Sequence, residues 1–473
     1  MQLLWIIAAL LLFIIQIASI IILEYRRSNK AIAWLIILFL FPIFGFLLYY
    51  FVAKEYFCHR TLRRKKNRHW ESFKSDLIHR CKQRIAIDMV EETVCQEDNL
   101  HALLKNMPSI PITACNETTI YAEGEQAFEA MLESIAGARH HIHIEFYIIR
   151  DDNLGTRFER LLIRKAQEGV QVRLLYDGFG SRRLGKAFLK RLQDAGVETG
   201  CFFPPVAAFF DKRLNYRNHR KIVVVDGKIG FLGGLNIGDE YLGKDPAFGY
   251  WRDTHFSMKG DAVLWIQYTF LTDWYLVKEQ IITDSVYYPV QESQGREFVQ
   301  IVKSGPDETI LELIFSLIVS AKKRLYIETP YFVPDPGILL ALKTAVISGI
   351  DVRIIIPDVP DKKIVYYASL SYVQELLQAG ARFYCYQKGF LHSKVIISDN
   401  LACSGSANMD IRSFCGQFEL NAVFFDGKVI DRLVQDFFRD LSLSQEILLP
   451  EFEKRPGIQK MKEVFARLLS PLF

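Results

Sequence analysis

Two short segments of the chain share a spacing of residue types that suits phosphoryl transfer. Both read His-x-Lys-x4-Asp, and their residues are His219, Lys221, Asp226, His392, Lys394 and Asp399. Histidine titrates near neutral pH and can attack phosphorus, whereas lysine supplies a positive charge that stabilises phosphate oxygens. Two such units brought together would make a phosphoryl-transfer site that needs no metal.

Each motif is followed by a glycine-bearing segment that ends in asparagine, Asn236 in the first and Asn408 in the second. The apolar, β-branched residues between Lys and Asp predict a strand, whose alternation points His and Lys to the same face. A phosphodiester is anionic, so its non-bridging oxygens must be neutralised during attack. We expect Lys221, Lys394, Asn236 and Asn408 to bind these oxygens.

The repetition extends beyond the motifs. Residues 142–145 parallel 325–328, and residues 169–173 parallel 349–353. Each copy reads strand, amphipathic helix, glycine, apolar strand, helix and motif strand, which predicts an α/β fold with mixed, largely parallel sheets and flanking helices. We expect tandem copies at 108–290 and 291–473, with one motif from each meeting in a single site at their interface.

Two histidines in one site suggest a double displacement. One imidazole attacks phosphorus to give a covalent phosphohistidine, while the other, protonated, donates to the departing alcohol and then deprotonates the incoming one. The residues alone do not distinguish which histidine attacks. A nucleophilic imidazole also needs an acceptor at its other nitrogen, and Asp253 and Glu419 are matched candidates.

Other acidic residues recur in both copies. Asp226 and Asp399 lie at the far ends of their motif strands, where we expect mainly a structural role, ordering a turn or pairing with a cation. Glu145 and Glu328 end core strands, and a hydrogen bond at the interface between copies is at least as well supported as a catalytic role.

The first 53 residues differ from the rest. Segments 3–23 and 31–53 are apolar and long enough to cross a hydrocarbon core of about 30 Å, which predicts a two-helix transmembrane hairpin. A cleaved signal peptide is the alternative for the first segment, but no charged region precedes it. Residues 54–107 form a basic juxtamembrane connector, read either as a topology signal or as an anchor for anionic headgroups. The positive-inside rule then places both termini and the catalytic part in the cytoplasm.

Composition limits other functions. The 58 basic and 54 acidic residues balance to +4, so charge alone does not indicate nucleic-acid binding. The eight cysteines lack a Cys-x-x-Cys pair, and the cluster His140, His141 and His143 is better explained by packing than by metal. The Phe-rich segment 202–210 fits either core or a loop that enters the bilayer. The apolar spacing of 461–469 favours a packing face over a membrane contact.

Further runs carry a resemblance to a known family; they are Asn215 to Lys221, Asn236 to Tyr241, Trp251 to His255 and Gly405 to Phe414. With them, the chain resembles the phospholipase D superfamily and, within it, the bacterial cardiolipin synthases. The resemblance covers nearly the whole chain. It implies a multi-pass enzyme of the cell membrane that condenses two phosphatidylglycerol molecules to cardiolipin and glycerol through a phosphatidyl-histidine, without metal or cofactor.

The same resemblance implies His219 as the nucleophile and His392 as the acid and base, and it labels Asp226 and Asp399 as active-site residues. Anionic phospholipids and the bilayer are the expected partners, nucleic acid is not, and the oligomeric state stays open. Three alternatives remain: hydrolysis or transfer to another headgroup alcohol, a nuclease, which would gain nothing from two spans, and a catalytically inactive membrane scaffold.

Overall fold

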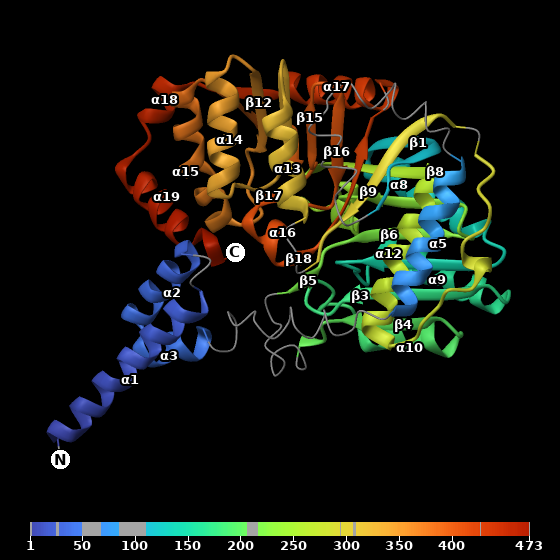
Figure 1. Ribbon diagram of the computed structural model, residues 1–473, viewed down its shortest axis with the longest axis horizontal. Coiled ribbons are helices and arrows are strands. Elements are labelled where there is room, and N and C mark those ends of the chain that lie inside the picture. The colour runs from blue at the N-terminus through green and yellow to red at the C-terminus, as the bar shows by residue number, and fades with distance from the viewer. Residues whose placement is uncertain are drawn as a thin grey trace.

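The computed structural model describes residues 2–24, 28–49, 68–84, 110–205, 216–293, 295–305, 309–425 and 427–472. A helical module at the N-terminus projects from a body in which helices surround a long central sheet (Figure 1). Of the sequence predictions, the basic run at 54–67 and residues 206–210 of the Phe-rich segment lie outside the described residues.

Strands of both copies form one continuous sheet. The first copy contributes β1 (Thr113–Glu123), β2 (His141–Phe146), β3 (Gln171–Asp177), β4 (Glu198–Phe202), β6 (Lys221–Val225), β7 (Ile229–Gly233) and β8 (Tyr250–Lys259). The second contributes β9 (Glu297–Lys303), β10 (Arg324–Glu328), β12 (Asp351–Pro357), β13 (Arg382–Tyr386), β15 (Val395–Ser398), β16 (Leu401–Gly405), β19 (Leu420–Phe424) and β20 (Ser444–Ile447).

The order of these strands reveals the duplication. It runs β20-β13-β12-β10-β15-β16-β19-β9-β1-β8-β7-β6-β2-β3-β4. Apart from the edge strand β20, each strand of one copy has its counterpart at the mirrored position. The antiparallel pair β1 and β9 joins the halves at the centre, so the copies share a pseudo-two-fold arrangement.

The mixed α/β fold is confirmed, but the expectation of largely parallel sheets is wrong. Only β2-β3-β4 and β10-β12-β13 are parallel sets, and the other neighbours in the order run antiparallel except at the β14 branch. The motif strands β6 and β15 each turn directly into the next strand through Asp226 (φ 53°) and Asp399 (φ 48°). A turn this short joins only antiparallel strands, whereas parallel pairing requires a crossover.

Helices supply the packing that holds the copies together. The outer helices are α8 (Gly124–Ala136), α9 (Asn153–Gln167), α10 (Lys186–Asp194), α13 (Thr309–Ser320), α14 (Pro336–Ile347) and α15 (Lys363–Ala379). Two further helices, α12 (Asp261–Lys278) and α17 (Gly427–Ser442), follow the equivalent strands β8 and β19. One core cluster includes Trp265 and Trp274 of α12, Phe437 of α17 and strand residues of both copies. The copies therefore share a core as well as a sheet.

The N-terminal module comprises α1 (Gln2–Leu23), α2 (Ser28–Leu40) and α3 (Pro42–Leu48). Within the described residues, α1 alone is long and apolar enough to cross a membrane, as judged by length and composition. The expected second span is not one continuous helix. It breaks at Phe41, and α3 packs back on α2, with the Trp34 and Tyr49 rings 5.4 Å apart.

The break has a local cause. Pro42 lacks an N–H and its ring clashes with the carbonyl one turn earlier, so a helix does not continue through it without strain. Gly45 then permits the close return, since a Cβ there would lie 2.8 Å from the carbonyl oxygen of Ile37. Residues 50–53 of the expected span lie outside the described residues.

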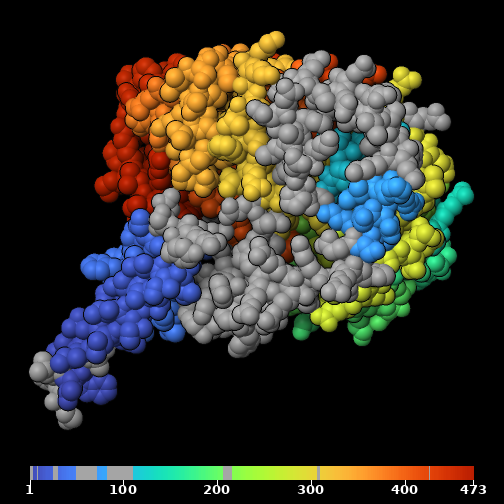
Figure 2. All heavy atoms as spheres, viewed as in Figure 1, coloured from blue at the N-terminus to red at the C-terminus, as the bar shows by residue number. Residues whose placement is uncertain are grey.

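The N-terminal module contacts the end of the chain. The short helix η4 (Ser470–Leu472) follows α19 (Gly457–Leu469), and Leu472 packs against a cluster in the module that includes Trp34, Leu38 and Tyr49. The C-terminal end of the described chain therefore lies beside α2 at one corner of the body, from which the module projects, while the start of α1 lies at the far tip of the module (Figure 1 and Figure 2).

Candidate active site

Each motif histidine lies where a short strand of one copy pairs with the other copy. The strand β5 (Arg217–Asn218) runs parallel to β18 (Gln417–Phe418), and β14 (Gly389–Leu391) runs parallel to β8. The backbone N–H of His219 donates to the Phe418 carbonyl oxygen at 2.9 Å, and that of His392 to the Arg252 carbonyl oxygen at 2.7 Å. Both histidines are thus fixed by the opposite copy in the same way.

The imidazoles are also held by carboxylates of the opposite copy. Nδ1 of His219 lies 3.1 Å from both carboxylate oxygens of Glu419, and Nδ1 of His392 lies 2.6 Å from Oδ2 of Asp253. Such a carboxylate favours the tautomer with the proton on Nδ1, which leaves Nε2 to react. Both carboxylates are predicted from the sequence as candidates for this role. The sequence does not predict that each carboxylate pairs with the histidine of the opposite copy.

Two buried ammonium groups accompany the imidazoles. Nζ of Lys221 donates to the His219 carbonyl oxygen at 2.6 Å, and Nζ of Lys394 lies 2.9 Å from Nδ1 of His392. Burial lowers the pKa of Lys221 to about 7 and that of Lys394 to about 8, although nearby carboxylates oppose the shift. The positive charge of both lysines therefore depends on pH near neutrality, and an anion bound beside them favours the charged form.

The electrostatics link both motifs. Burial lowers the pKa of His219 to about 4 and that of His392 to about 3. The positive charge of the motif lysine in the opposite copy lowers the pKa of each imidazole further. Burial alone would raise the pKa of Asp253, yet Lys394 and His392 bring it down to about 2. The free site therefore holds neutral imidazoles and anionic carboxylates beside two lysines whose positive charge is lost as the pH rises through about 7 and about 8.

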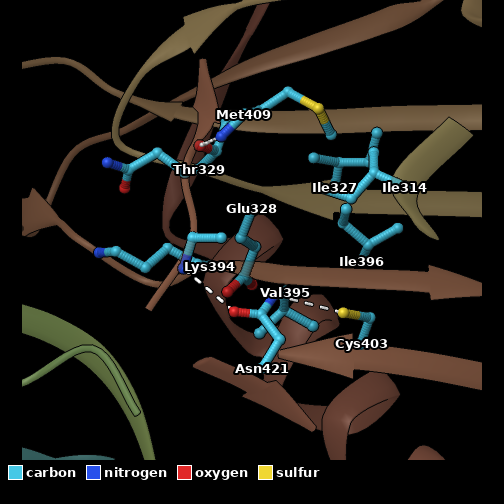
Figure 3. A pocket seen from close by; sticks show the side chains of 12 residues that line it. Ile314, Ile327, Glu328, Thr329, Lys394, Val395, Ile396, Cys403, Met409 and Asn421 are labelled. Carbon is cyan, nitrogen blue, oxygen red and sulfur yellow. Dashed lines mark hydrogen bonds between the residues drawn. The ribbon is translucent and has the colours of Figure 1, made fainter. Parts of the chain in front are cut away.

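The two asparagines differ. Asn236 accepts from the Ile148 N–H and donates to the Tyr241 hydroxyl, both at 3.1 Å, so a phosphate contact requires exchange of one of these bonds. Oδ1 of Asn408 is buried and has no hydrogen-bond partner among the described residues. Asn408 lines a small pocket together with Lys394, Glu328 and Thr329. Figure 3 shows the last three of these side chains around the pocket.

Asp226 and Asp399 lie at the opposite ends of the motif strands from the histidines. The carboxylate of Asp226 accepts from the N–H groups of residues 139–141 at 2.8–2.9 Å. Asp399 accepts in the same way from residues 322–324 at 2.5–3.0 Å. These contacts join each motif turn to the start of the neighbouring strand. The structure therefore brings the histidines, the lysines, Asp253 and Glu419 together and leaves Asp226 and Asp399 apart.

Sequence reasoning missed two arginines that hold the carboxylate residues. Nε of Arg220 donates to the Glu419 carbonyl oxygen at 3.1 Å, and its guanidinium also pairs with Asp273 of α12. Arg252 donates to the Asp253 carbonyl oxygen and pairs through Nε with Asp440 of α17 at 2.5 Å. In the sequence, only the position of each arginine could have indicated this role: Arg220 lies inside the first motif, and Arg252 directly precedes Asp253.

Glu145 and Glu328 lie beside these arginines. Nδ2 of Asn218 donates to Glu145, and Nη2 of Arg252 lies 3.9 Å from Glu328. Burial raises the pKa of Glu145 well above its usual range and that of Glu328 to about 8, so burial favours the protonated form of both carboxyls. The hydrogen bond of Glu145 lies within the first copy, whereas Glu328 faces Arg252 of the opposite copy.

Comparisons with known proteins identify the relatives of this chain. Residues 131–245 and 314–441 match the family described as "Cardiolipin synthase, PLD-like domain". Cardiolipin synthase 2 of Bacillus anthracis is 45% identical over 466 residues, which cover 96% of this chain and 89% of the relative. The major cardiolipin synthase ClsA of Bacillus subtilis (strain 168) is 41% identical over 479 residues, 98% of each chain.

A solved structure shares the fold. Phosphatidylserine synthase of Haemophilus influenzae Rd KW20 matches with a TM-score of 0.62 at 16% identity, covering 80% of this chain and 100% of that one. The near-complete coverage of the bacterial relatives, together with the paired histidine motifs, leads to one conclusion. The chain is an enzyme that belongs to the cardiolipin synthase family with phospholipase D-like domains.

Proposed function

We propose that this enzyme condenses two phosphatidylglycerol molecules into cardiolipin and glycerol through a covalent phosphatidyl-histidine. The observation that carries the proposal is the pair of imidazoles, each with Nδ1 on a carboxylate of the opposite copy and each beside a buried lysine. Relatives named cardiolipin synthase along the whole chain point to the same reaction.

In the first displacement, Nε2 of His219 attacks the phosphorus of one phosphatidylglycerol. The P–N bond forms as the P–O bond to glycerol breaks, and protonated His392 donates its proton to the departing oxygen. Glu419 stabilises the positive charge that develops on the His219 ring. Lys221, Lys394 and Asn408 neutralise the non-bridging oxygens.

The second displacement reverses the proton transfer. Neutral His392 takes the proton from a glycerol hydroxyl of the second phosphatidylglycerol, whose oxygen attacks phosphorus as the P–N bond breaks. Cardiolipin leaves, and His392 is again protonated. Because the imidazole pKa is depressed in the empty site, the anionic phosphodiester must raise it on binding, and Asp253 assists by holding Nδ1.

Asp226 and Asp399 take a positioning role in this scheme. Their carboxylates bind three consecutive N–H groups each, which orders the turn after the motif strand and so fixes the strand that carries the lysine. Asn236 has the related task of fixing the loop beside the site, through Ile148 and Tyr241.

The membrane placement is part of the proposal. Helix α1 anchors the enzyme in the cell membrane, where lipid is the abundant acceptor and water is scarce. The catalytic body faces the cytoplasm, since cations are concentrated in residues 54–68 that follow the N-terminal module. The proposal includes a second crossing of the membrane by α2 and α3, which places both termini in the cytoplasm.

A product assay tests the reaction. The purified enzyme is incubated with vesicles of phosphatidylglycerol, and the lipids and the water-soluble products are identified by mass spectrometry. Cardiolipin with equimolar glycerol is expected. Phosphatidic acid would favour the hydrolase alternative, a different phosphatidyl alcohol would favour another acceptor, and no product from correctly folded enzyme would contradict the proposal.

A further inference from the structure

Helix α19 exposes an apolar face that a soluble body does not need. Its exposed members are Ile458 (66% exposed), Met461 (70%), Val464 (61%), Phe465 (53%) and Leu468 (46%). Their spacing places them on one side of the helix. Contiguous exposed apolar surface of this kind marks an interaction site.

The opposite face of α19 packs against the protein through Ala466 and through polar side chains. Glu463 is 3% exposed and pairs with Arg455 at 2.8 Å. Arg467 pairs with Glu375 of α15 at 2.9 Å and donates to the Ser371 carbonyl oxygen at 3.2 Å. This is the reverse of an ordinary surface helix, in which the apolar side packs inward and the polar side faces water. The expectation that this apolar face would pack within the protein is therefore not met.

The position of α19 indicates what covers this face. The helix leads directly into η4, whose Leu472 packs on the N-terminal module. Helix α19 is therefore held next to the module that also contains α1, the helix with the length and composition of a membrane span. Lys460 and Lys462, both exposed, add positive charge suited to anionic headgroups.

We propose that α19 lies in the membrane interface, with its apolar face inserted among phospholipid acyl chains. The protein would then contact the bilayer at two places, α1 and α19. Because α19 is attached to α15 by polar contacts, these two contacts would fix the orientation of the second copy relative to the membrane. The inference rests on the membrane placement of α1 proposed above but not on the reaction.

Photo-crosslinking tests the contact directly. The full-length His219→Ala enzyme is reconstituted in vesicles of phosphatidylcholine and phosphatidylglycerol that contain a phospholipid with a diazirine in its acyl chain. After irradiation, adducts are mapped by peptide mass spectrometry. We expect lipid adducts in both α1 and residues 458–468, and none at Val286 and Val290, which are exposed apolar residues of the first copy.

The outcomes separate the two proposals. Adducts in α1 without adducts in α19 would overturn the inference while leaving the anchor in place. In a parallel sample treated with an amine-reactive bifunctional crosslinker, links between Lys460 or Lys462 of two copies would overturn it in favour of a second copy as the occupant. Adducts in neither helix would overturn both the inference and the membrane placement in the proposed function.

A variant provides the second test. Met461→Gln/Phe465→Gln removes apolar surface without touching the polar contacts of α19, and Val286→Gln/Val290→Gln is the matched control. In the active enzyme, we expect the first variant to lose several-fold in turnover on vesicles but not on mixed detergent micelles, with the control unchanged on both. An equal loss on micelles, or no loss on vesicles, would contradict the role in membrane docking, and thermal unfolding of both variants verifies the fold.

Discussion

The crossed carboxylates make a prediction at the level of single residues. Glu419→Gln keeps the shape of the side chain, but its amide favours the wrong tautomer of His219 and no longer stabilises the developing charge. We expect kcat to fall on the order of 10²-fold or more, with little change in KM. Asp253→Asn should behave similarly through His392. Steady-state kinetics on vesicles measure both, and Glu446→Gln, which removes an exposed carboxylate paired with Arg382, is the control.

Either variant with wild-type kcat would contradict the assigned pairs. Trapping with labelled phosphatidylglycerol in a His392→Asn background then identifies the nucleophile. The label is expected on His219, and its appearance elsewhere would reverse or remove the assigned roles.

The lysines predict a pH dependence of substrate binding. Their pKa values are lowered to about 7 and about 8, so in the free enzyme the positive charge is full below these values and is lost as the pH rises through them. An anionic phosphodiester binds the charged form and holds the proton. We therefore expect KM to rise between about pH 7 and pH 9 while kcat changes less. A pH profile in which kcat falls and KM stays constant would contradict this account.

At this scale, the sequence predicts residue types better than their partners. The spacing of His and Lys identifies the reacting groups because strand alternation is local. The partners of Arg252 depend on the meeting of β8 with α17, far apart in the sequence, so its role is visible only in three dimensions. The same limit applies to Asn236 and Asn408, whose equivalent sequence positions have different hydrogen-bond environments.

At the scale of elements, Arg252 connects strand β8 of the first copy to helix α17 of the second. Arg252→Met would leave the buried Asp440 with only the more distant Arg439, at 4.0 Å, so we expect a loss of about 3 kcal/mol in the free energy of unfolding. Arg252→Met/Asp440→Leu removes both charges and should recover part of this loss. The free energies of unfolding are measured by denaturant unfolding in detergent for Arg252→Met, Asp440→Leu and the double variant. If the loss in the double variant equals the sum of the losses in the two single variants, the ion pair does not connect the two elements.

Apolar periodicity in the sequence predicts some features of the helices and strands but not others. The helices and strands of both copies follow from apolar periodicity, but their pairing does not, which is why the antiparallel hairpins at Asp226 and Asp399 were missed. In the N-terminal module, composition correctly indicates an apolar segment at 31–53. It does not predict that the helix breaks at Pro42 and that α3 packs back on α2. For α19, the periodicity of apolar residues predicts the face but not whether that face points inward or outward.

At the scale of the whole molecule, the shared sheet and the shared core make the two copies one unit. Each imidazole lies against a carboxylate of the other copy within a single chain, and Trp265 and Phe437 pack in a core cluster to which both copies contribute. The duplication is evident from sequence, and a site at the interface follows from it. The continuous sheet through β1 and β9 does not, because pairing between copies leaves no local pattern.

This arrangement predicts that inactive variants cannot complement one another. His219→Ala and His392→Ala each lack one half of a site that a single chain supplies, so we expect each to be inactive and a co-expressed mixture of the two to be no more active than either alone. If the imidazoles of one site came from two chains, mixed assemblies would contain intact sites and activity would return. The measurement is cardiolipin formation by the co-purified, differently tagged variants, with His79→Ala, at an exposed histidine of α5 (Arg68–Arg84), as the control that should retain activity.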